Sequence, residues 1–325
     1  MTPTFDDVLN AAARLDGIAT KTPLIESRIL NERIGGRVLL KLETLQHTGA
    51  FKFRGAYNKI SRLSSLTNKG GIVAYSGGNH AQGAAAAARL MDIPALIMMP
   101  RNATQFKIER TRDFGAEIRF YEPEDSHLRM AVAAKLADDR EAVVVPSYDD
   151  LHIIAGQGTV GLEIFQKARK MDIEIDSLLT PCSGGGLSSG CALVKESLSP
   201  NTKLFTVEPE GFDDTARSLR KGLRLENEPG KKSICDALLM SPPGEITFPI
   251  NQRSVTAGIV VTDDQVKEAM IFAFFHLKLV LEPGGAVALA TILAEKHEFE
   301  NKTTAIVCSG GNIDQAMFHQ LISKA

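Results

Sequence analysis

Short apolar segments alternate with helix-forming segments through most of this sequence. Helical patterns cover about 81–90, 105–114 and 125–138, and the most polar stretch, about 219–233, is predicted to be exposed. Strands joined by helices run parallel and need helices on both faces of their sheet. The sequence therefore predicts an α/β fold with parallel sheets. The predicted strands are residues 72–75, 95–99, 117–121, 142–145, 177–182, 203–207 and 304–308.

Three of the predicted strands end in glycine-rich turns. These are Ser-Gly-Gly-Asn-His at 76–80, Ser-Gly-Gly-Gly-Leu at 183–187 and Ser-Gly-Gly-Asn at 309–312. In open α/β sheets, ligands bind beyond the carboxyl ends of the strands. A tight strand-to-helix turn needs about one glycine, and further glycines let backbone N–H groups approach a phosphate. The three consecutive glycines at 184–186 therefore favour a phosphate-binding loop.

A nicotinamide-dinucleotide site is an alternative explanation of the middle turn. Gly184-x-Gly186-x-x-x-Gly190 is a loosened form of the dinucleotide fingerprint, and Glu208 follows at about the distance of a ribose-binding acid. The glycine spacing differs from the fingerprint by one residue, and the loop lies in the middle of the chain. No GxxxxGK[ST] motif is present, so a nucleotide triphosphatase is not supported.

Lys52 lies between two aromatic residues, Phe51 and Phe53. Removal from water lowers the pKa of a lysine, and the neutral amine is a nucleophile that forms a Schiff base with an aldehyde. The alternative is a lysine whose stem packs on the core while its head stays in water. The flanking rings favour a desolvated, reactive amine.

Composition limits the classes of protein that this chain can belong to. Its 325 residues fit one large or two modest domains, and the net charge of -2 gives no electrostatic case for nucleic acid or membrane partners. No apolar run reaches the roughly 18 residues that span a bilayer, and the first residues do not resemble a signal peptide. The four cysteines show no regular spacing, so free thiols in a reducing cytoplasm are expected.

Several motifs together resemble the fold-type II pyridoxal-phosphate enzymes, most closely the serine/threonine dehydratase and serine racemase group. The resemblance covers nearly the whole chain. It implies two open, twisted, mostly parallel sheets covered by helices. It also implies a large domain of residues 1–47 and 148–325, a small domain of 48–147, no C-terminal regulatory domain, and a homodimer. The motifs lie at residues 41–46, 51–56, 76–82, 155–159, 183–187 and 282–286.

The resemblance assigns a role to individual positions. Lys52 matches the Schiff-base lysine, Phe51 the residue packed on the cofactor ring, and Asn79 the partner of the ring's 3-hydroxyl. Ser309 matches the residue facing the pyridine nitrogen, and Glu282 belongs to a cofactor-site motif. The expected phosphate cradle is Ser183, Gly184, Gly185, Gly186 and Leu187. The expected clamp on the substrate carboxylate is Ser76, Gly77, Asn79 and His80.

Two positions shape the expected chemistry, and a third departs from the family pattern. A neutral Ser309 leaves the pyridine nitrogen unprotonated, and the weaker electron sink favours prompt loss of a β-substituent. Gly77 stands where the racemase has a serine that acts as the second acid/base, so elimination should dominate over racemisation. Ala50 replaces a serine found in many relatives, with no consequence that the sequence explains.

A divalent-cation site is also implied by the resemblance. Glu208 and Asp214 would supply carboxylates, and Phe212 its backbone carbonyl. Oxygen ligands of this kind suit Mg²⁺, Ca²⁺ or Mn²⁺. A solvated acidic turn is the alternative. The expected role is structural or allosteric.

The expected function is pyridoxal-phosphate-dependent dehydration and deamination of L-threonine or L-serine to a 2-oxo acid and ammonia. threo-3-Hydroxyaspartate is an alternative substrate, whose second carboxylate would need a cation such as Arg54, Arg129 or His152. The loop 146–154 is expected near the substrate side chain. The sequence favours less strongly a serine racemase, a cofactor-free binding protein on the same scaffold, or an NAD-dependent enzyme.

Overall fold

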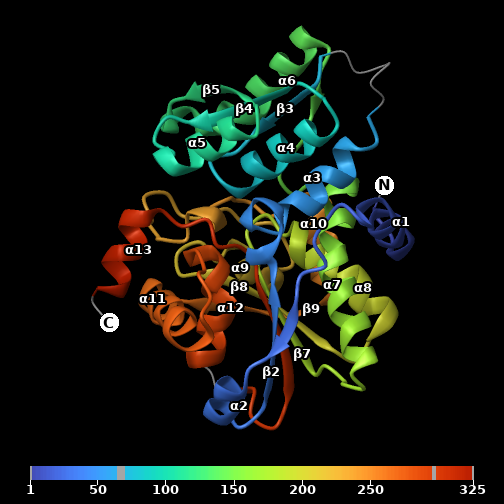
Figure 1. Cartoon of the computed structure of the whole chain (residues 1–325), viewed down its shortest axis with the longest axis vertical. Coiled ribbons are helices and arrows are strands. Elements are labelled where there is room, and N and C mark those ends of the chain that lie inside the picture. Colours follow the sequence, from blue (N-terminus) through green and yellow to red (C-terminus); the bar gives the residue numbers. More distant parts are fainter. Residues whose placement is uncertain (1, 64–69, 295–297, 324–325) are drawn as a thin grey trace.

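The computed structural model describes residues 2–63, 70–294 and 298–323, and it contains two sheets (Figure 1). The six-stranded sheet has the order β1-β2-β10-β7-β8-β9, and only β1 runs antiparallel to its neighbour within the described pairs. The four-stranded sheet, β5-β4-β3-β6, is parallel throughout. The larger sheet consists of β1 (Leu24–Glu26), β2 (Arg37–Leu42), β7 (Ser177–Pro181), β8 (Lys203–Pro209), β9 (Val255–Val261) and β10 (Thr303–Cys308). The smaller consists of β3 (Ile72–Tyr75), β4 (Ala95–Pro100), β5 (Glu117–Tyr121) and β6 (Val143–Val144).

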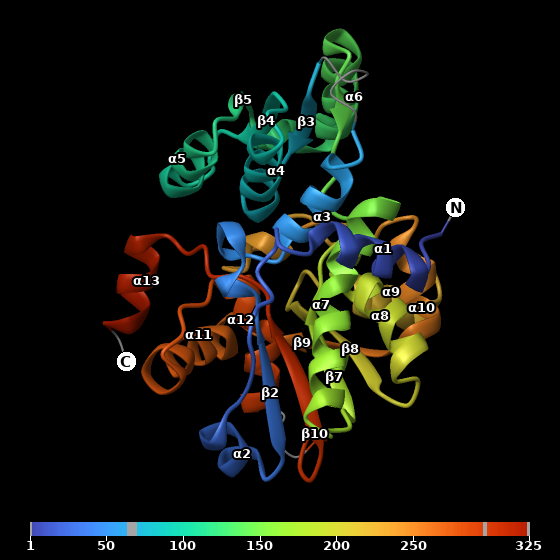
Figure 2. The same cartoon turned by 45° about the vertical axis from the view of Figure 1, so that its right-hand side comes forward.

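Helices cover both faces of the six-stranded sheet (Figure 2). Successive strand residues point to opposite faces, so Leu39 packs in one core cluster and Leu40 in the other. This explains why its central strands, β2, β10 and β7, are buried at nearly every position. One cluster includes α1 (Phe5–Leu15), α7 (Leu151–Lys170), α8 (Gly186–Leu198) and α10 (Thr247–Ser254). The other includes α2 (Arg28–Ile34), α11 (Asp263–Phe272) and α12 (Pro283–Ala294).

The four-stranded sheet is enclosed in the same way. Val73 packs against α6, whereas its neighbour Ala74 packs in the cluster of α3 and α4. The helices around this sheet are α3 (Lys52–Ile60), α4 (Asn79–Leu90), α5 (Gln105–Asp113) and α6 (Arg129–Arg140). The remaining helices are α9 (Asp214–Lys221), α13 (Gln315–Ile322), the 3₁₀ turns η1 (Glu43–Leu45), η2 (His47–Gly49), η3 (Pro123–Leu128) and η4 (Asp236–Leu238), and the π-helix η5 (Ala273–Leu277).

Helix α3 lies between the two sheets and contacts both α4 and α7. It crosses α7 closely, because a Cβ atom on Gly156 would lie 2.6 Å from the Cα of Gly55. Phe53 on the same helix packs into the core of the four-stranded sheet. The helix that begins at Lys52 is thus held from both sides.

The predicted fold class is confirmed, and each of the seven predicted strands is present. The strands 72–75 and 117–121 have the predicted bounds. The helix expected from residue 125 begins at 129, because a 3₁₀ helix occupies 123–128. The stretch 219–233 is largely exposed as predicted, although its first three residues end α9. The strands β1, β2 and β9 were not predicted.

The domain boundaries stay a prediction. The strands of the four-stranded sheet all fall within the expected small domain, 48–147. None of the helices in the described ranges combines the length and the apolar character that crossing a bilayer requires.

Candidate active site

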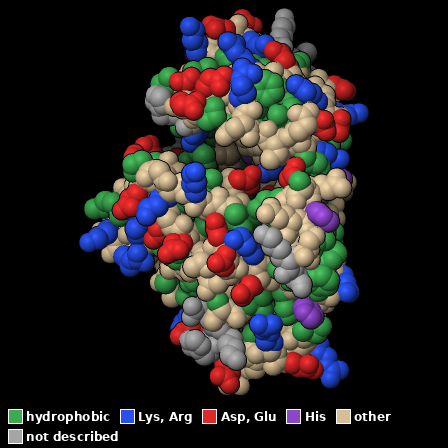
Figure 3. All heavy atoms as spheres, turned by 90° about the vertical axis from the view of Figure 1, so that its left-hand side faces the viewer, with side chains coloured by type: hydrophobic (Ala, Val, Ile, Leu, Met, Phe, Trp, Pro, Cys, Tyr) green, Lys and Arg blue, Asp and Glu red, His purple; other side chains and the backbone are tan. Residues whose placement is uncertain are grey.

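A cavity of about 370 Å³ lies between the two sheets. Figure 3 shows the surface hollowed between the part that contains the four-stranded sheet and the rest of the molecule. The walls of the cavity include residues at or just beyond the carboxyl ends of β3, β4, β5, β7 and β10. This is where open α/β sheets place ligands.

All the predicted cofactor and substrate residues line this cavity. They come from five separate segments of the chain, which only the fold brings together. They are Phe51, Lys52, Ser76, Gly77, Asn79, His80, Ser183, Gly184, Gly185, Gly186, Leu187, Glu282 and Ser309. The three residues predicted to bind a metal do not line it.

Lys52, the first residue of α3, presents its amine to the cavity. Its Nζ donates a hydrogen bond to the carbonyl oxygen of Ser147 at 2.7 Å and lies 5.2 Å from the centre of the Phe51 ring. Burial lowers the pKa of Lys52 to about 8. The turn before it is fixed by a hydrogen bond from Phe51 N–H to Ser309 O at 3.1 Å. A substantial neutral fraction of this amine is therefore present near physiological pH.

The glycine loop 183–186 precedes α8, and its glycines are required by close contacts. A Cβ on Gly184 would lie 2.3 Å from the ring of Tyr148, and one on Gly186 would lie 3.0 Å from the Tyr148 Cβ. Gly185 has φ +91°, a conformation that favours glycine. The loop thus lines the cavity at the positive end of a 13-residue helix, a suitable place for a phosphate.

The loop 76–80 forms the opposite wall, at the start of α4. Gly78 N–H donates to Ser76 Oγ at 3.2 Å, and a Cβ on Gly77 would lie 3.0 Å from Pro100. His80 is buried and its Nε2 contacts the carbonyl oxygen of Val145 at 2.9 Å. Burial and the nearby Lys52 amine lower the pKa of His80 to about 3, so this ring is neutral and donates from Nε2.

Asn79 and Glu282 meet at the end of the cavity where β10 ends. The Asn79 Nδ2 donates to Glu282 Oε1, and the Asn79 Oδ1 accepts a hydrogen bond from Asn312 at 2.7 Å. Glu282 is buried and its Oε2 has no hydrogen-bond partner among the described residues. Burial raises the pKa of Glu282 to about 7.

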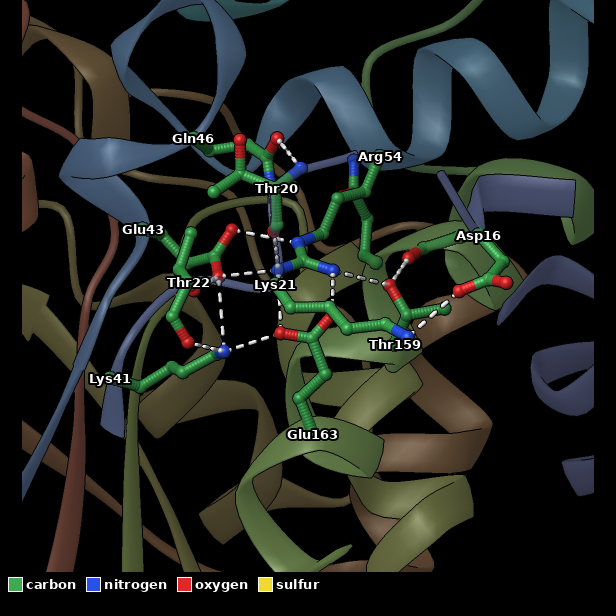
Figure 4. A network of polar contacts seen from close by, with 12 residues as sticks. Asp16, Thr20, Lys21, Thr22, Lys41, Glu43, Gln46, Arg54, Thr159 and Glu163 are labelled. Atoms are coloured by element: carbon green, nitrogen blue, oxygen red, sulfur yellow. Dashed lines mark hydrogen bonds and ion pairs between the residues drawn. The ribbon is translucent and has the colours of Figure 1, made fainter. Parts of the chain in front are cut away.

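A buried ion-pair network anchors the helix of Lys52 to the six-stranded sheet (Figure 4). Arg54 donates from Nε to Glu43 at 2.8 Å and from Nη1 to Glu163 at 2.7 Å. Lys41 of β2 donates to Glu163 at 2.5 Å. The network thus joins α3 to β2, η1 and α7. Its member on α3, Arg54, lies two residues after Lys52.

Arg129 is the member of the predicted cation set that reaches the cavity. It lines the wall at the start of α6, and its Nη2 contacts the sulfur of Met240 at 3.1 Å. Arg54 is instead held in the ion-pair network, and His152 lies on α7 outside the cavity lining. Of the loop 146–154, Ser147 and Tyr148 line the cavity.

Several lining residues were missed from the sequence. Tyr148 supports the glycine loop, and Lys107 of α5 pairs with Asp236 of η4. Tyr75 and Tyr121 also line the wall. The polar loop positions gave a weak signal for Tyr148, whereas the lysine–aspartate pair joins segments far apart in sequence and carries no local signal.

Glu208 and Asp214 lie behind the glycine loop, where β8 leads into α9. Both are buried, and the Oδ2 of Asp214 has no hydrogen-bond partner among the described residues. Glu208 accepts hydrogen bonds from the N–H groups of Thr215 and Ala216 at 3.0 and 2.7 Å. Burial raises the pKa of both carboxyls, and the charge of Asp214 adds to the shift of Glu208. No cluster of three or more His, Cys, Asp and Glu suited to a metal occurs in the described ranges.

A protein-family comparison decides what kind of site this is. The model of the family described as pyridoxal-phosphate dependent enzyme matches residues 15–310. The chain belongs to this family. The predicted family is therefore confirmed.

Individual relatives of the pyridoxal-phosphate-dependent family span nearly this whole chain. The L-threonine ammonia-lyase of Thermotoga maritima is 40% identical, covering 99% of this chain and 78% of that protein. The L-threo-3-hydroxyaspartate ammonia-lyase of Pseudomonas sp is 38% identical, covering 98% of each. The structure of maize serine racemase superposes with a TM-score of 0.92 at 33% identity, covering 100% of this chain and 98% of that one. The names of the two lyases agree with the predicted reaction class.

The cavity fits the cofactor of this family. A desolvated lysine amine and a glycine loop at a helix N-terminus both line it. The amine suits the aldehyde of pyridoxal phosphate, and the loop suits its phosphate. The structure argues against the dinucleotide alternative. Glu208, its candidate ribose-binding acid, accepts hydrogen bonds from the first N–H groups of α9 and does not line the cavity.

Proposed function

We propose that this chain is a pyridoxal-phosphate-dependent ammonia-lyase that dehydrates and deaminates L-threonine or L-serine. The observation that carries the proposal is the pairing of Lys52 with Gly77 in one cavity. Lys52 supplies a base of suitable pKa, and Gly77 has no side chain that could exchange a proton on the other side of the substrate. The ammonia-lyase relatives support the same reaction class.

The cofactor would be held at both ends. Lys52 would bond to its aldehyde carbon, and the backbone N–H groups of 183–187 would bind its phosphate. Asn79 would donate to the 3-oxygen of the ring, and the neutral Ser309 hydroxyl would face the ring nitrogen. When bound, pyridoxal phosphate supplies an electron sink for the negative charge that develops at the substrate Cα.

The chain's own residues then handle binding and proton transfer. The loop 76–80 would bind the substrate carboxylate with its N–H groups at the start of α4. The neutral amine of Lys52 would take the Cα proton. The β-hydroxyl would leave as water with the proton that Lys52 gives back, and the released enamine would hydrolyse to the 2-oxo acid and ammonia.

The decisive test of this function is Lys52→Ala. The variant should lose the yellow colour of the covalently bound cofactor and all turnover of threonine and serine. Lys21→Ala, which changes an exposed lysine paired with Asp16, serves as the control and should keep both. Retained elimination by Lys52→Ala would refute the assignment. A wild-type protein that binds no pyridoxal phosphate would favour the cofactor-free binding protein.

threo-3-Hydroxyaspartate is a second candidate substrate, favoured by the position of Arg129. This guanidinium lies on the cavity wall beyond the end of β5, where it can meet a carboxylate on the substrate β-carbon. Arg129→Met should lower kcat/KM for hydroxyaspartate at least tenfold more than for threonine. Equal losses for the two substrates would exclude this role.

We also propose that Glu208, Asp214 and the Phe212 carbonyl bind a divalent cation. The support is a pair of buried carboxyls, one of which leaves an oxygen without a partner among the residues that the structure describes. Because their folded-state pKa values are raised, their stabilising contribution is present at low pH and is lost as pH rises through the raised values, to about 7 for Asp214. Mg²⁺ should therefore raise Tm of chelator-treated protein more at pH 8 than at pH 6. An equal effect in Asp214→Asn would contradict this site.

The homodimer stays a proposal that rests on the resemblance, and the cytoplasmic location stays one that rests on the spacing of the cysteines. Light scattering coupled to size-exclusion chromatography would measure the mass directly, and a monomer would contradict the proposal.

A further inference from the structure

We propose that Asn312 is a positioning residue that fixes the direction of the Asn79 amide, so that Asn79 offers only N–H donors to the cavity. The proposal rests on the proposed function for the identity of the ligand, a ring oxygen of pyridoxal phosphate. It concerns a chain of hydrogen bonds from Thr48 through Asn312 and Asn79 to Glu282. All four residues are buried.

The direction of this chain is set at its first member. The carbonyl oxygen of Thr48 can only accept a hydrogen bond, and Asn312 lies 2.7 Å from it. Asn312 must therefore turn its NH₂ group to Thr48. The same Nδ2 reaches Asn79 at 2.7 Å, so the atom of Asn79 that faces it must be the acceptor, Oδ1.

The far end of the chain agrees with this direction. With Oδ1 facing Asn312, the NH₂ group of Asn79 faces Glu282 Oε1, which accepts one of its hydrogens. The charge of Lys107 lowers the pKa of Glu282, and the charge of Asp236 raises it. A protonated Glu282 can carry its proton on Oε2, which has no partner in the described part of the chain, so Oε1 accepts in either state.

The turn before Lys52 holds Asn312 in place. A Cβ on Gly49 would lie 2.7 Å from Asn312 Oδ1, and Gly311 N–H donates to Gly49 O at 2.9 Å. The backbone of Thr48 and Gly49 has positive φ, 63° and 71°. The segment that leads into Lys52 thus also holds the Asn312 amide in place.

One N–H of Asn79 remains for the cofactor. A ring oxygen that meets only donors is stabilised as the anion, since a hydroxyl there would find no acceptor on Asn79. Without Asn312 the amide can rotate and present its oxygen instead. Asn312 therefore acts on the protonation of the bound ring through Asn79, without contacting the ring.

The experiment compares Asn312→Leu and the milder Asn312→Asp with the wild type. Both variants should shift the absorbance of the bound cofactor from the long-wavelength band of the 3-oxygen anion toward the near-ultraviolet band. They should also weaken cofactor binding on the order of tenfold. Asn58→Leu is the matched control, because Asn58 is a buried amide that donates to the His152 carbonyl at 2.7 Å outside the cavity. Asn58→Leu should leave the band ratio unchanged.

The Asn79→Ala background tests whether Asn312 acts through Asn79. There, Asn312→Leu should cause no further change in the band ratio. An unchanged ratio in both Asn312 variants, or the same further shift without the Asn79 amide, would overturn the proposal.

A cofactor-free readout separates this inference from the proposed function. The side-chain N–H signals of Asn79 in the NMR spectrum should be protected from exchange in wild-type protein and lose protection in Asn312→Leu. Protection unaffected by that change would count against the inference. A wild type that binds no pyridoxal phosphate would contradict the proposed function, while the amide signals would still decide the geometry.

Discussion

At the scale of single residues, the amine of Lys52 combines a low-polarity setting with a fixed direction. Its neighbours are the Phe51 ring and the Ser147 carbonyl, which orients the amine without giving it a counter-charge. Burial therefore dominates and lowers its pKa to about 8. An unperturbed lysine, with a pKa of about 10.4, would be almost wholly protonated at neutral pH.

The lowered pKa of Lys52 predicts how cofactor attachment depends on pH. Only the neutral amine attacks an aldehyde, so the attachment rate in cofactor-free protein should rise with pH and level off above about 8. Stopped-flow absorbance after addition of pyridoxal phosphate measures this rate. A rate that keeps rising to about pH 10 would indicate an ordinary lysine.

Gly77 is the residue whose replacement should change the outcome of the reaction. Gly77→Ser would add a hydroxyl to the wall opposite Lys52, and its Cβ would press on Pro100 at 3.0 Å. Racemisation relative to elimination should increase about tenfold while total activity falls. Chiral chromatography of the remaining serine gives the ratio. Gly77→Ala controls for the steric contact and should not racemise.

At the scale of elements, helix α3 is held by close packing and by buried ion pairs. Gly55 and Gly156 let α3 and α7 cross in close contact, and Arg54 ties the same helix to Glu43 and Glu163. Neither carboxylate nor the guanidinium faces the cavity. Their contribution to activity is therefore the position and rigidity of the helix that begins at Lys52.

Removal of one charge from the buried ion-pair network around Arg54 should lower the stability of the fold. Glu43→Gln leaves Lys41 and Arg54 with less compensation in a buried setting, so stability should fall by about 3–5 kcal/mol. Urea unfolding of the two proteins measures the difference. Glu32→Gln, which breaks the exposed pair with Arg28, should leave the unfolding midpoint nearly unchanged. A comparable loss in both variants would show that burial is not the cause.

At the scale of the whole molecule, the cavity depends on two sheets that carry separate cores. Cofactor attachment through Lys52 and phosphate binding at 183–187 would link α3 to the end of β7, while the 76–80 loop closes the other side. A ligand that binds only the folded state stabilises it, by about 2.7 kcal/mol at a hundredfold excess over Kd. The loaded protein should thus unfold later than the empty one.

A comparison of two aldehydes tests this link. Pyridoxal phosphate should raise Tm clearly more than pyridoxal, which can react with Lys52 but leaves the glycine loop without a phosphate. Differential scanning calorimetry measures both. An equal rise would mean that the loop 183–187 does not bind the phosphate.

The sequence predicted local features well and distant contacts poorly. Lys52 and the glycines of 183–187 were predicted because their chemistry is written in adjacent residues. β9 was missed because it follows α10 directly, without a glycine or proline to mark the boundary. The Asn312–Asn79 contact and the Lys107–Asp236 pair join segments more than a hundred residues apart, and only tertiary structure brings them together.

The position of Arg129 has a consequence for how this enzyme could diverge. It sits where β5 leads into α6, on the four-stranded sheet, whereas the glycine loop, Glu282 and Ser309 belong to the six-stranded sheet. Mutations in one short surface segment could therefore alter substrate preference while selection keeps the reaction chemistry intact. Relatives of nearly equal identity do carry the names of different substrates.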